Sequence, residues 1–170
     1  MHNILKFVLK CIDHLSEICG KIASPMPMIA AMCICYEIGM RYFLHKPTIW
    51  ASEATIILCA TCYFLGGAVN IKNDVHVRVD IAYNWLKPRT RAAFDCFTFL
   101  FFAMYIGMML WLIWPYMVQS IGLRESTQTA WNPPLWPLKV VMFTGFTLVA
   151  LQGLAGFVRN IYHVIWGKTL

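Results

Sequence analysis

The chain has 170 residues, of which 59% are hydrophobic and only 13% are charged, against roughly 25% charged residues in a typical soluble domain. This composition excludes a soluble globular domain and predicts an all-α integral membrane protein. The net charge is +6, but the basic residues lie between long apolar segments and no DNA-reading motif is present, so a nucleic-acid partner is not expected.

The first element predicted in the chain is an amphipathic helix over residues 2–20. Apolar side chains recur with helical period on one face. Its charged side chains fall on the opposite face: Lys6, Lys10, Asp13, Glu17 and Lys21. A helix of this kind typically lies in the headgroup region of a membrane, as an interfacial helix; the alternative is that it extends the first span. Pro25 and Pro27 are expected to end it.

Four apolar segments follow, each long enough to cross the roughly 30 Å hydrocarbon core of a bilayer. These transmembrane segments cover residues 26–44, 51–69, 92–117 and 140–161. The whole chain, 1–170, is expected to form a single membrane domain. The last segment carries Gly145, Gly153 and Gly156, which would let a neighbouring helix approach closely.

The connection between the second and third segments, residues 70–91, is the longest charged interruption of the chain. It holds five of the fourteen Lys and Arg: Lys72, Arg78, Lys87, Arg89 and Arg91. Short basic connections stay in the cytoplasm. With both termini inside, only four basic residues fall outside: Arg41, Lys46, Arg124 and Lys139. The sequence therefore predicts an N-in, C-in topology.

Within that connection, apolar and polar residues alternate around His76, Arg78 and Asp80. The pattern predicts a short cytoplasmic segment that lies along the interface and orders this side of the protein. The alternative is a solvated basic turn that sets the topology and nothing more.

Glu37 and Arg41 form a polar pair within the first segment. They are four residues apart and so share a helical face. A charge placed in hydrocarbon costs roughly 2.5–3.5 kcal/mol on insertion scales, so each group is expected to have a partner. The pair either contacts another subunit or a substrate path, or is self-contained near the outer interface. Glu53 would join the same cluster if the first two segments pack as a hairpin.

A membrane redox protein is the alternative function. Cys59 and Cys62 form a CxxC motif, but a quinone-coupled disulfide oxidase relays electrons from a second, outer pair of cysteines, and the outer connections contain none. A haem-binding bundle needs paired histidines at mid-depth. The five histidines lie at or beyond segment ends: His2, His14, His45, His76 and His163. No cofactor, metal site or enzymatic activity is therefore expected, and a quinone- or haem-linked four-helix protein is the second hypothesis.

Short motifs along the chain resemble the small membrane subunit of tripartite ATP-independent periplasmic (TRAP) transporters. In order, the matching stretches are Arg41–Phe43, Pro47–Glu53, Gly66–Ala68, His76–Asp80, Leu86–Arg91, Arg124–Ser126 and Pro134–Lys139. The resemblance covers nearly the whole chain after the N-terminal helix. Ala54 stands where the family usually has a second acidic residue beside Glu53, which weakens any role for an acidic pair.

The resemblance implies a non-enzymatic subunit of the bacterial inner membrane, embedded in membrane lipids. Its partners would be a large sodium-coupled membrane subunit, which performs the symport, and a periplasmic binding protein that delivers an organic acid. The residues expected to dock these partners on the periplasmic side are Arg41, Trp50, Glu53, Arg124, Glu125 and Ser126. A third hypothesis is a stand-alone small membrane protein or assembly factor, which would be stable without a large partner.

Overall fold

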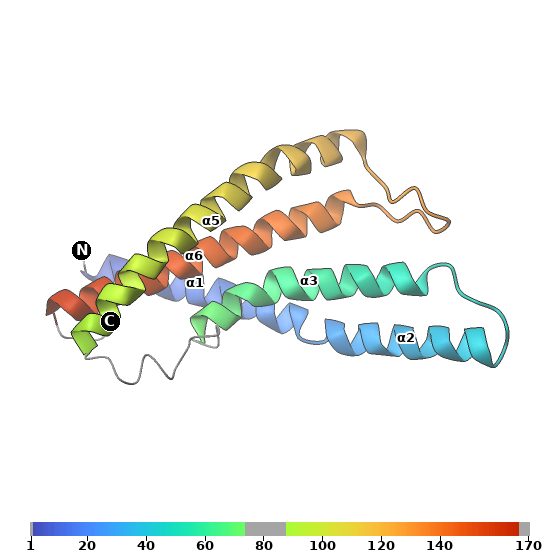
Figure 1. Cartoon of the computed structure of the whole chain (residues 1–170), viewed down its shortest axis with the longest axis horizontal. Coiled ribbons are helices and arrows are strands. Elements are labelled where there is room, and N and C mark those ends of the chain that lie inside the picture. The colour runs from blue at the N-terminus through green and yellow to red at the C-terminus, as the bar shows by residue number, and fades with distance from the viewer. Residues whose placement is uncertain (1, 74–87, 167–170) are drawn as a thin grey trace.

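The computed structural model describes residues 2–73 and 88–166 as five helices: α1 (His2–Ala23), α2 (Met26–Tyr42), α3 (Ala51–Lys72), α5 (Pro88–Leu123) and α6 (Trp136–Trp166). No strand occurs in these ranges; an isolated bridge joins Ser126 to Pro134. The chain is therefore all-helical where it is described, as its composition predicted. Figure 1 shows both termini at one end of the molecule and the connections 43–50 and 124–135 at the other, which we call the two-loop end.

Four stretches are long and apolar enough to cross a membrane. They are Lys6–Tyr42, Ala51–Lys72, Phe97–Leu123 and Trp136–Arg159. This confirms the prediction of four membrane spans. The orientation of the spans, the placement of the N-terminal helix in the interface and the interfacial segment around His76 stay predictions.

The break between α1 and α2 lies where the prolines predicted it. The amide of Ser24 donates to the carbonyl of Gly20 at 2.8 Å, which closes the last turn of α1. The amide of Ile29 donates to the carbonyl of Pro25 at 3.1 Å and opens α2. Proline is tolerated in a first helical turn because amides there have no helical partner. The chain thus changes direction over Ser24 and Pro25.

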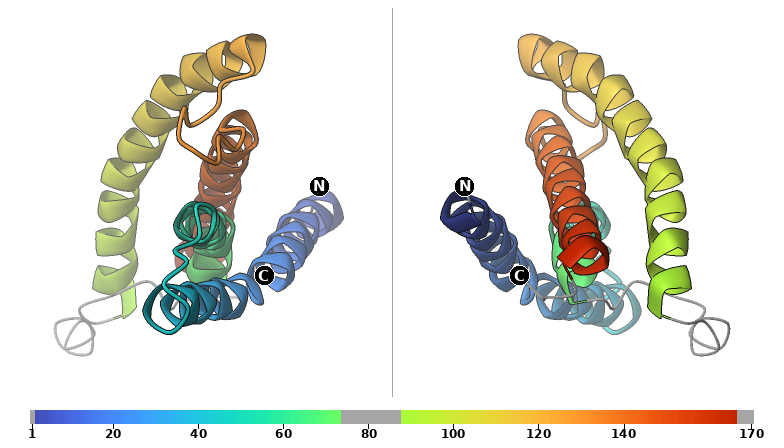
Figure 2. Two further views of the ribbon diagram at one scale, coloured as in Figure 1. Left: turned by 90° about the vertical axis from the view of Figure 1, so that its right-hand side faces the viewer. Right: turned by 90° about the vertical axis from the view of Figure 1, so that its left-hand side faces the viewer.

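The helices that cross the molecule form a row. α3 packs against both α2 and α6, and α6 packs against α5. α1 packs on α3 and α6, and Figure 2 shows α1 and α5 on opposite sides of α6. α5 bows around this centre (Figure 2) and contains Pro115, which has no N–H to donate to the carbonyl of Trp111.

Small residues and stacked rings hold the row together. A Cβ atom on Gly145 of α6 would lie 2.4 Å from the carbonyl oxygen of Phe64 on α3, so these two backbones touch. Phe99 of α5 stacks on Phe157 of α6 with centroids 4.1 Å apart. Few large side chains are buried, whereas large apolar residues are exposed on every helix with described side chains. In a membrane protein such surfaces face lipid or a partner subunit.

Candidate functional site

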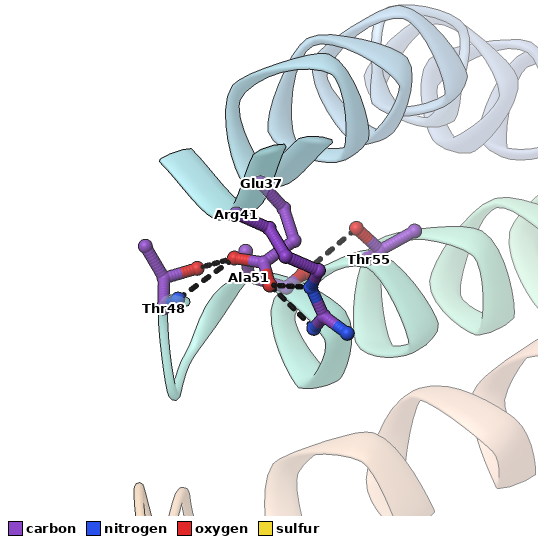
Figure 3. Close-up of polar contacts among 5 residues, drawn as sticks. All are labelled: Glu37, Arg41, Thr48, Ala51 and Thr55. Carbon is purple, nitrogen blue, oxygen red and sulfur yellow. Dashed lines mark hydrogen bonds and ion pairs between the residues drawn. The ribbon is translucent and has the colours of Figure 1, made fainter. Parts of the chain in front are cut away.

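Glu37 organises the two-loop end by binding the α2–α3 connection, as Figure 3 shows. Its Oε1 accepts hydrogen bonds from Arg41 Nε at 3.1 Å and from Arg41 Nη2 at 2.6 Å. Its Oε2 accepts from the backbone amide of Thr48 at 3.0 Å and from the Thr48 hydroxyl. The Glu37 side chain is 12% exposed and that of Arg41 is 55% exposed. The carboxylate is therefore fully occupied within the chain, while the guanidinium still faces outward.

Replacing Glu37 by alanine is expected to release the 43–50 loop. The Thr48 amide would lose a charge-assisted acceptor worth roughly 1.5–3 kcal/mol, which corresponds to a tenfold or larger rise in local opening. Hydrogen exchange of the Thr48 amide measures this directly. Arg41→Gln is the matched variant, because it removes the ion pair but leaves both Thr48 contacts. An equal acceleration in both variants, or none in either, would show that Glu37 does not hold the loop.

Residues 124–135 form an ordered hairpin at the same end. The amide of Leu135 donates to the carbonyl of Glu125 at 2.8 Å, and the amide of Thr127 donates to the carbonyl of Pro133 at 3.1 Å. Nearer the tip, the Gln128 amide donates to Asn132 Oδ1 at 3.0 Å. These bonds make the connection between α5 and α6 a defined structure.

Arg124 sits at the base of this hairpin in a left-handed conformation, with φ of 47°. The amides of Arg124 and Glu125 donate to the carbonyls of Ile121 and Ser120 at 3.2 and 3.0 Å. This pair of bonds is a Schellman motif that ends α5, and its left-handed position usually holds glycine. A non-glycine residue there costs roughly 1–2 kcal/mol. The exposed Arg124 side chain is thus retained against a conformational cost.

Two carboxylates fix the hairpin to the bundle. Glu125 pairs with Lys139 of α6 at 2.5 Å, and the Lys139 ammonium holds the pKa of this carboxyl below its usual range. Glu53 of α3 accepts from the hydroxyl of Thr129 at 2.9 Å and from that of Thr127 at 3.4 Å. The hairpin is therefore tied to α6 at its base and to α3 near its tip.

The predicted docking residues divide into two groups. Arg41 and Arg124 are exposed, and Trp50 is 39% exposed and stacks on Tyr36 with centroids 5.9 Å apart. Glu53 and Glu125 instead bind hairpin and helix groups within the chain, and Ser126 takes part in the bridge to Pro134.

Glu53 does not join the Glu37 cluster in the structure, because its carboxylate accepts hydrogen bonds from the two hairpin threonines. The threonines that complete both clusters were missed by sequence reasoning. The only sign of these threonines in the sequence is that the two connections contain hydroxyl residues. His76, Arg78 and Asp80 lie outside the described residues.

A second polar cluster lies at the termini end, and sequence reasoning missed it as well. Asp13 of α1 accepts from Gln152 Nε2 at 2.9 Å and from Arg159 Nη2 at 2.6 Å, both on α6. Gln152 is 1% exposed. Nearby, Glu17 of α1 forms an ion pair with Lys72 of α3. These contacts join α1 to α6 and α3 at the termini end of the bundle.

Cys59 and Cys62 lie on α3 as free thiols, each half-buried. Within the described part of the chain, no group of three or more His, Cys, Asp or Glu residues could hold a metal ion. The expected absence of a cofactor stays a prediction.

Comparison with known proteins decides between the hypotheses. The sequence model of the DctQ component of tripartite ATP-independent periplasmic transporters matches residues 30–162. The chain belongs to the DctQ family. It is also 28% identical over 89 residues to the sialic acid TRAP transporter small permease protein SiaQ of Vibrio cholerae, a match that covers 51% of this chain and 49% of SiaQ.

Membership in the DctQ family makes this chain a multi-pass membrane component of a TRAP-type transporter and not an enzyme. The quinone- or haem-linked alternative is thereby set aside. The family is described as one component of tripartite transporters, so the two-loop end and the exposed helix faces are candidate contact surfaces.

Proposed function

We propose that this chain is the small permease subunit of a TRAP-type symporter in the bacterial inner membrane. It supports a large sodium-coupled membrane subunit and helps dock a periplasmic substrate-binding protein that delivers an organic acid. The observation that carries the proposal is the DctQ match over residues 30–162. The name of SiaQ, whose transporter handles the organic acid sialic acid, is consistent with this substrate class.

The proposed topology places both termini in the cytoplasm and the two-loop end in the periplasm. The distribution of basic residues supports it, since the connection 70–91 and the terminal regions hold most of the Lys and Arg, and short basic connections stay in the cytoplasm. In this orientation the 124–135 hairpin and the 43–50 loop face a soluble periplasmic partner. His76, Arg78 and Asp80 then belong to a cytoplasmic connection that orders the opposite side.

The proposed support role fits the sparse interior of the bundle. Among the described residues, the buried polar side chains are Ser16, Ser120 and Gln152, too few to build a coupled ion path. Large apolar side chains are exposed along α2 and α5 at the two edges of the row. A chain that buries little and exposes continuous apolar faces is suited to pack against a larger membrane subunit.

The proposed docking surface consists of three exposed side chains: Arg41, Trp50 and Arg124. Glu53, Glu125 and Ser126 support this surface through their contacts in the hairpin and the bundle. Arg124 is the strongest candidate within it. Strained conformations persist where the surroundings or the function require them, and glycine would fit this position without cost. A positive side chain at the base of a rigid hairpin could pair with an acidic group of the binding protein.

Arg124→Gly tests this docking role in the reconstituted transporter. It removes the guanidinium and relieves the left-handed strain, so the variant is expected to be at least as stable as the original chain. Binding-protein affinity is expected to fall roughly fivefold, the loss of about 1 kcal/mol for an exposed ion pair. Lys46→Gly, which removes a cation from the neighbouring loop, is the control. Unchanged affinity in Arg124→Gly would refute docking through Arg124.

A further inference from the structure

A cavity of about 760 Å³ lies at the junction of α1 and α2, against the second half of α3. Its lining comes from all three helices and includes Lys21, Ser24 and Pro27 at the junction and Cys59, Cys62 and Gly66 on α3. A Cβ atom on Gly20 would lie 2.5 Å from Val69 Cγ2, so α1 and α3 meet closely at its edge. The docking and hairpin groups at the two-loop end take no part in it.

The part of the cavity near α1 is polar, and its charged lining residues are Glu17 and Lys21. Glu17 is neutralised by its ion pair with Lys72. Lys21 has no ion-pair partner among the described residues, and it lines the cavity together with Ser24 and Asn70. An unpaired ammonium beside two further donors is chemistry suited to a phosphate group.

The part of the cavity along α3 is apolar and wide. Cys59, Cys62 and Gly66 recur at helical spacing, so they share one face of α3, and their small side chains leave space. A Cβ atom on Gly66 would meet nothing within 4 Å. Tyr63 stands beside them with 81% of its surface exposed. An extended hydrocarbon chain can lie along this face.

We propose that this cavity binds one anionic phospholipid. The headgroup phosphate lies at Lys21 and Ser24, and one acyl chain runs along Cys59, Cys62 and Gly66. Basic pockets between membrane helices recognise anionic headgroups in this manner. The proposal needs only the membrane location of the chain, so it stands or falls independently of the transport role.

Native mass spectrometry of the purified chain in mild detergent tests the proposal with phosphatidylglycerol and phosphatidylcholine as probes. The original chain is expected to retain one phosphatidylglycerol about fivefold more than phosphatidylcholine, the selectivity of about 1 kcal/mol that one exposed charge contact supplies. Lys21→Gln is expected to remove the preference. Gly66→Leu is expected to abolish retention of both lipids, because its side chain obstructs the face of α3 along which the acyl chain lies, and a Cβ atom there meets nothing within 4 Å.

Two matched variants separate the site from general effects. Lys10→Gln removes an exposed cation from the same helix outside the cavity, and Gly107→Leu adds a side chain in open space on α5; both are expected to bind like the original chain. Equal retention of the two lipids, or unaltered binding in Gly66→Leu, would overturn the proposal. So would a cross-link from the Cys62 thiol to the large subunit in the assembled transporter, because a protein segment would then occupy the cavity.

Discussion

Gly145→Leu is expected to prevent α3 and α6 from packing and so to abolish accumulation of the folded chain. Even a Cβ atom at this position would lie 2.4 Å from the Phe64 oxygen and 2.7 Å from the Phe64 carbonyl carbon. Both are backbone atoms, so no side-chain rotation relieves the clash. Overpacking usually costs about 1–3 kcal/mol and more where the backbone must move. Thermal unfolding and size-exclusion chromatography in detergent measure the effect.

Gly156→Leu is the control for this substitution. Gly156 lies on the same helix, and a Cβ atom there would meet nothing within 4 Å. The control is expected to remain folded and monodisperse, with a midpoint close to that of the original chain. If Gly145→Leu behaved like Gly156→Leu, α3 and α6 would not be in backbone contact and the central packing of the row would be wrong.

Asp13→Ala is expected to detach α1 from α6. The substitution removes the acceptor of Arg159 and leaves the amide of Gln152, which is 1% exposed, without its partner. An unpaired buried donor alone costs roughly 1–3 kcal/mol, and the Arg159 pair adds a smaller amount because both side chains are partly exposed. The rate of amide hydrogen exchange across residues 6–23 is expected to rise about tenfold or more, because a loss of about 1.4 kcal/mol in the free energy of opening corresponds to a factor of ten.

Glu17→Ala provides the comparison on the same helix. Glu17 also joins α1 to a neighbouring helix, but its side chain is 48% exposed, so solvent screens the ion pair and the expected effect is small. Hydrogen exchange of α1 is therefore expected to be clearly faster in Asp13→Ala than in Glu17→Ala. Equal protection of α1 in Asp13→Ala and in the original chain would mean that the Asp13 cluster does not hold this helix.

Much of the helical framework could be predicted from the sequence. Long apolar runs with few charges predict membrane-spanning helices, because a helix satisfies all of its backbone hydrogen bonds internally. The prolines at 25 and 27 predicted the break between α1 and α2. Helical spacing also indicated that Glu37 and Arg41 pair. The predicted spans 92–117 and 140–161 lie inside longer helices, because α5 and α6 continue beyond the apolar runs.

The tertiary contacts were harder to foresee, because they depend on how each helix is rotated in the bundle. Gly145 and Gly153 were expected at a close contact and are found there, whereas Gly156 is open. Glu53 was placed in the Glu37 cluster on the condition that the first two segments pack as a hairpin. α2 and α3 do pack together, but Glu53 binds Thr129, 76 residues away in the chain. Asp13 and Arg159 are 146 residues apart, and no local pattern connects residues at that separation.

Affinity purification of the tagged chain from its native host in mild detergent, followed by identification of the co-eluting proteins by mass, tests whether the chain supports a large membrane subunit. We expect a stoichiometric, very hydrophobic partner of about a dozen membrane spans, the size expected of a transporter built from repeated helical units. Elution of the chain alone, folded and monodisperse, would contradict the proposed role as a support subunit.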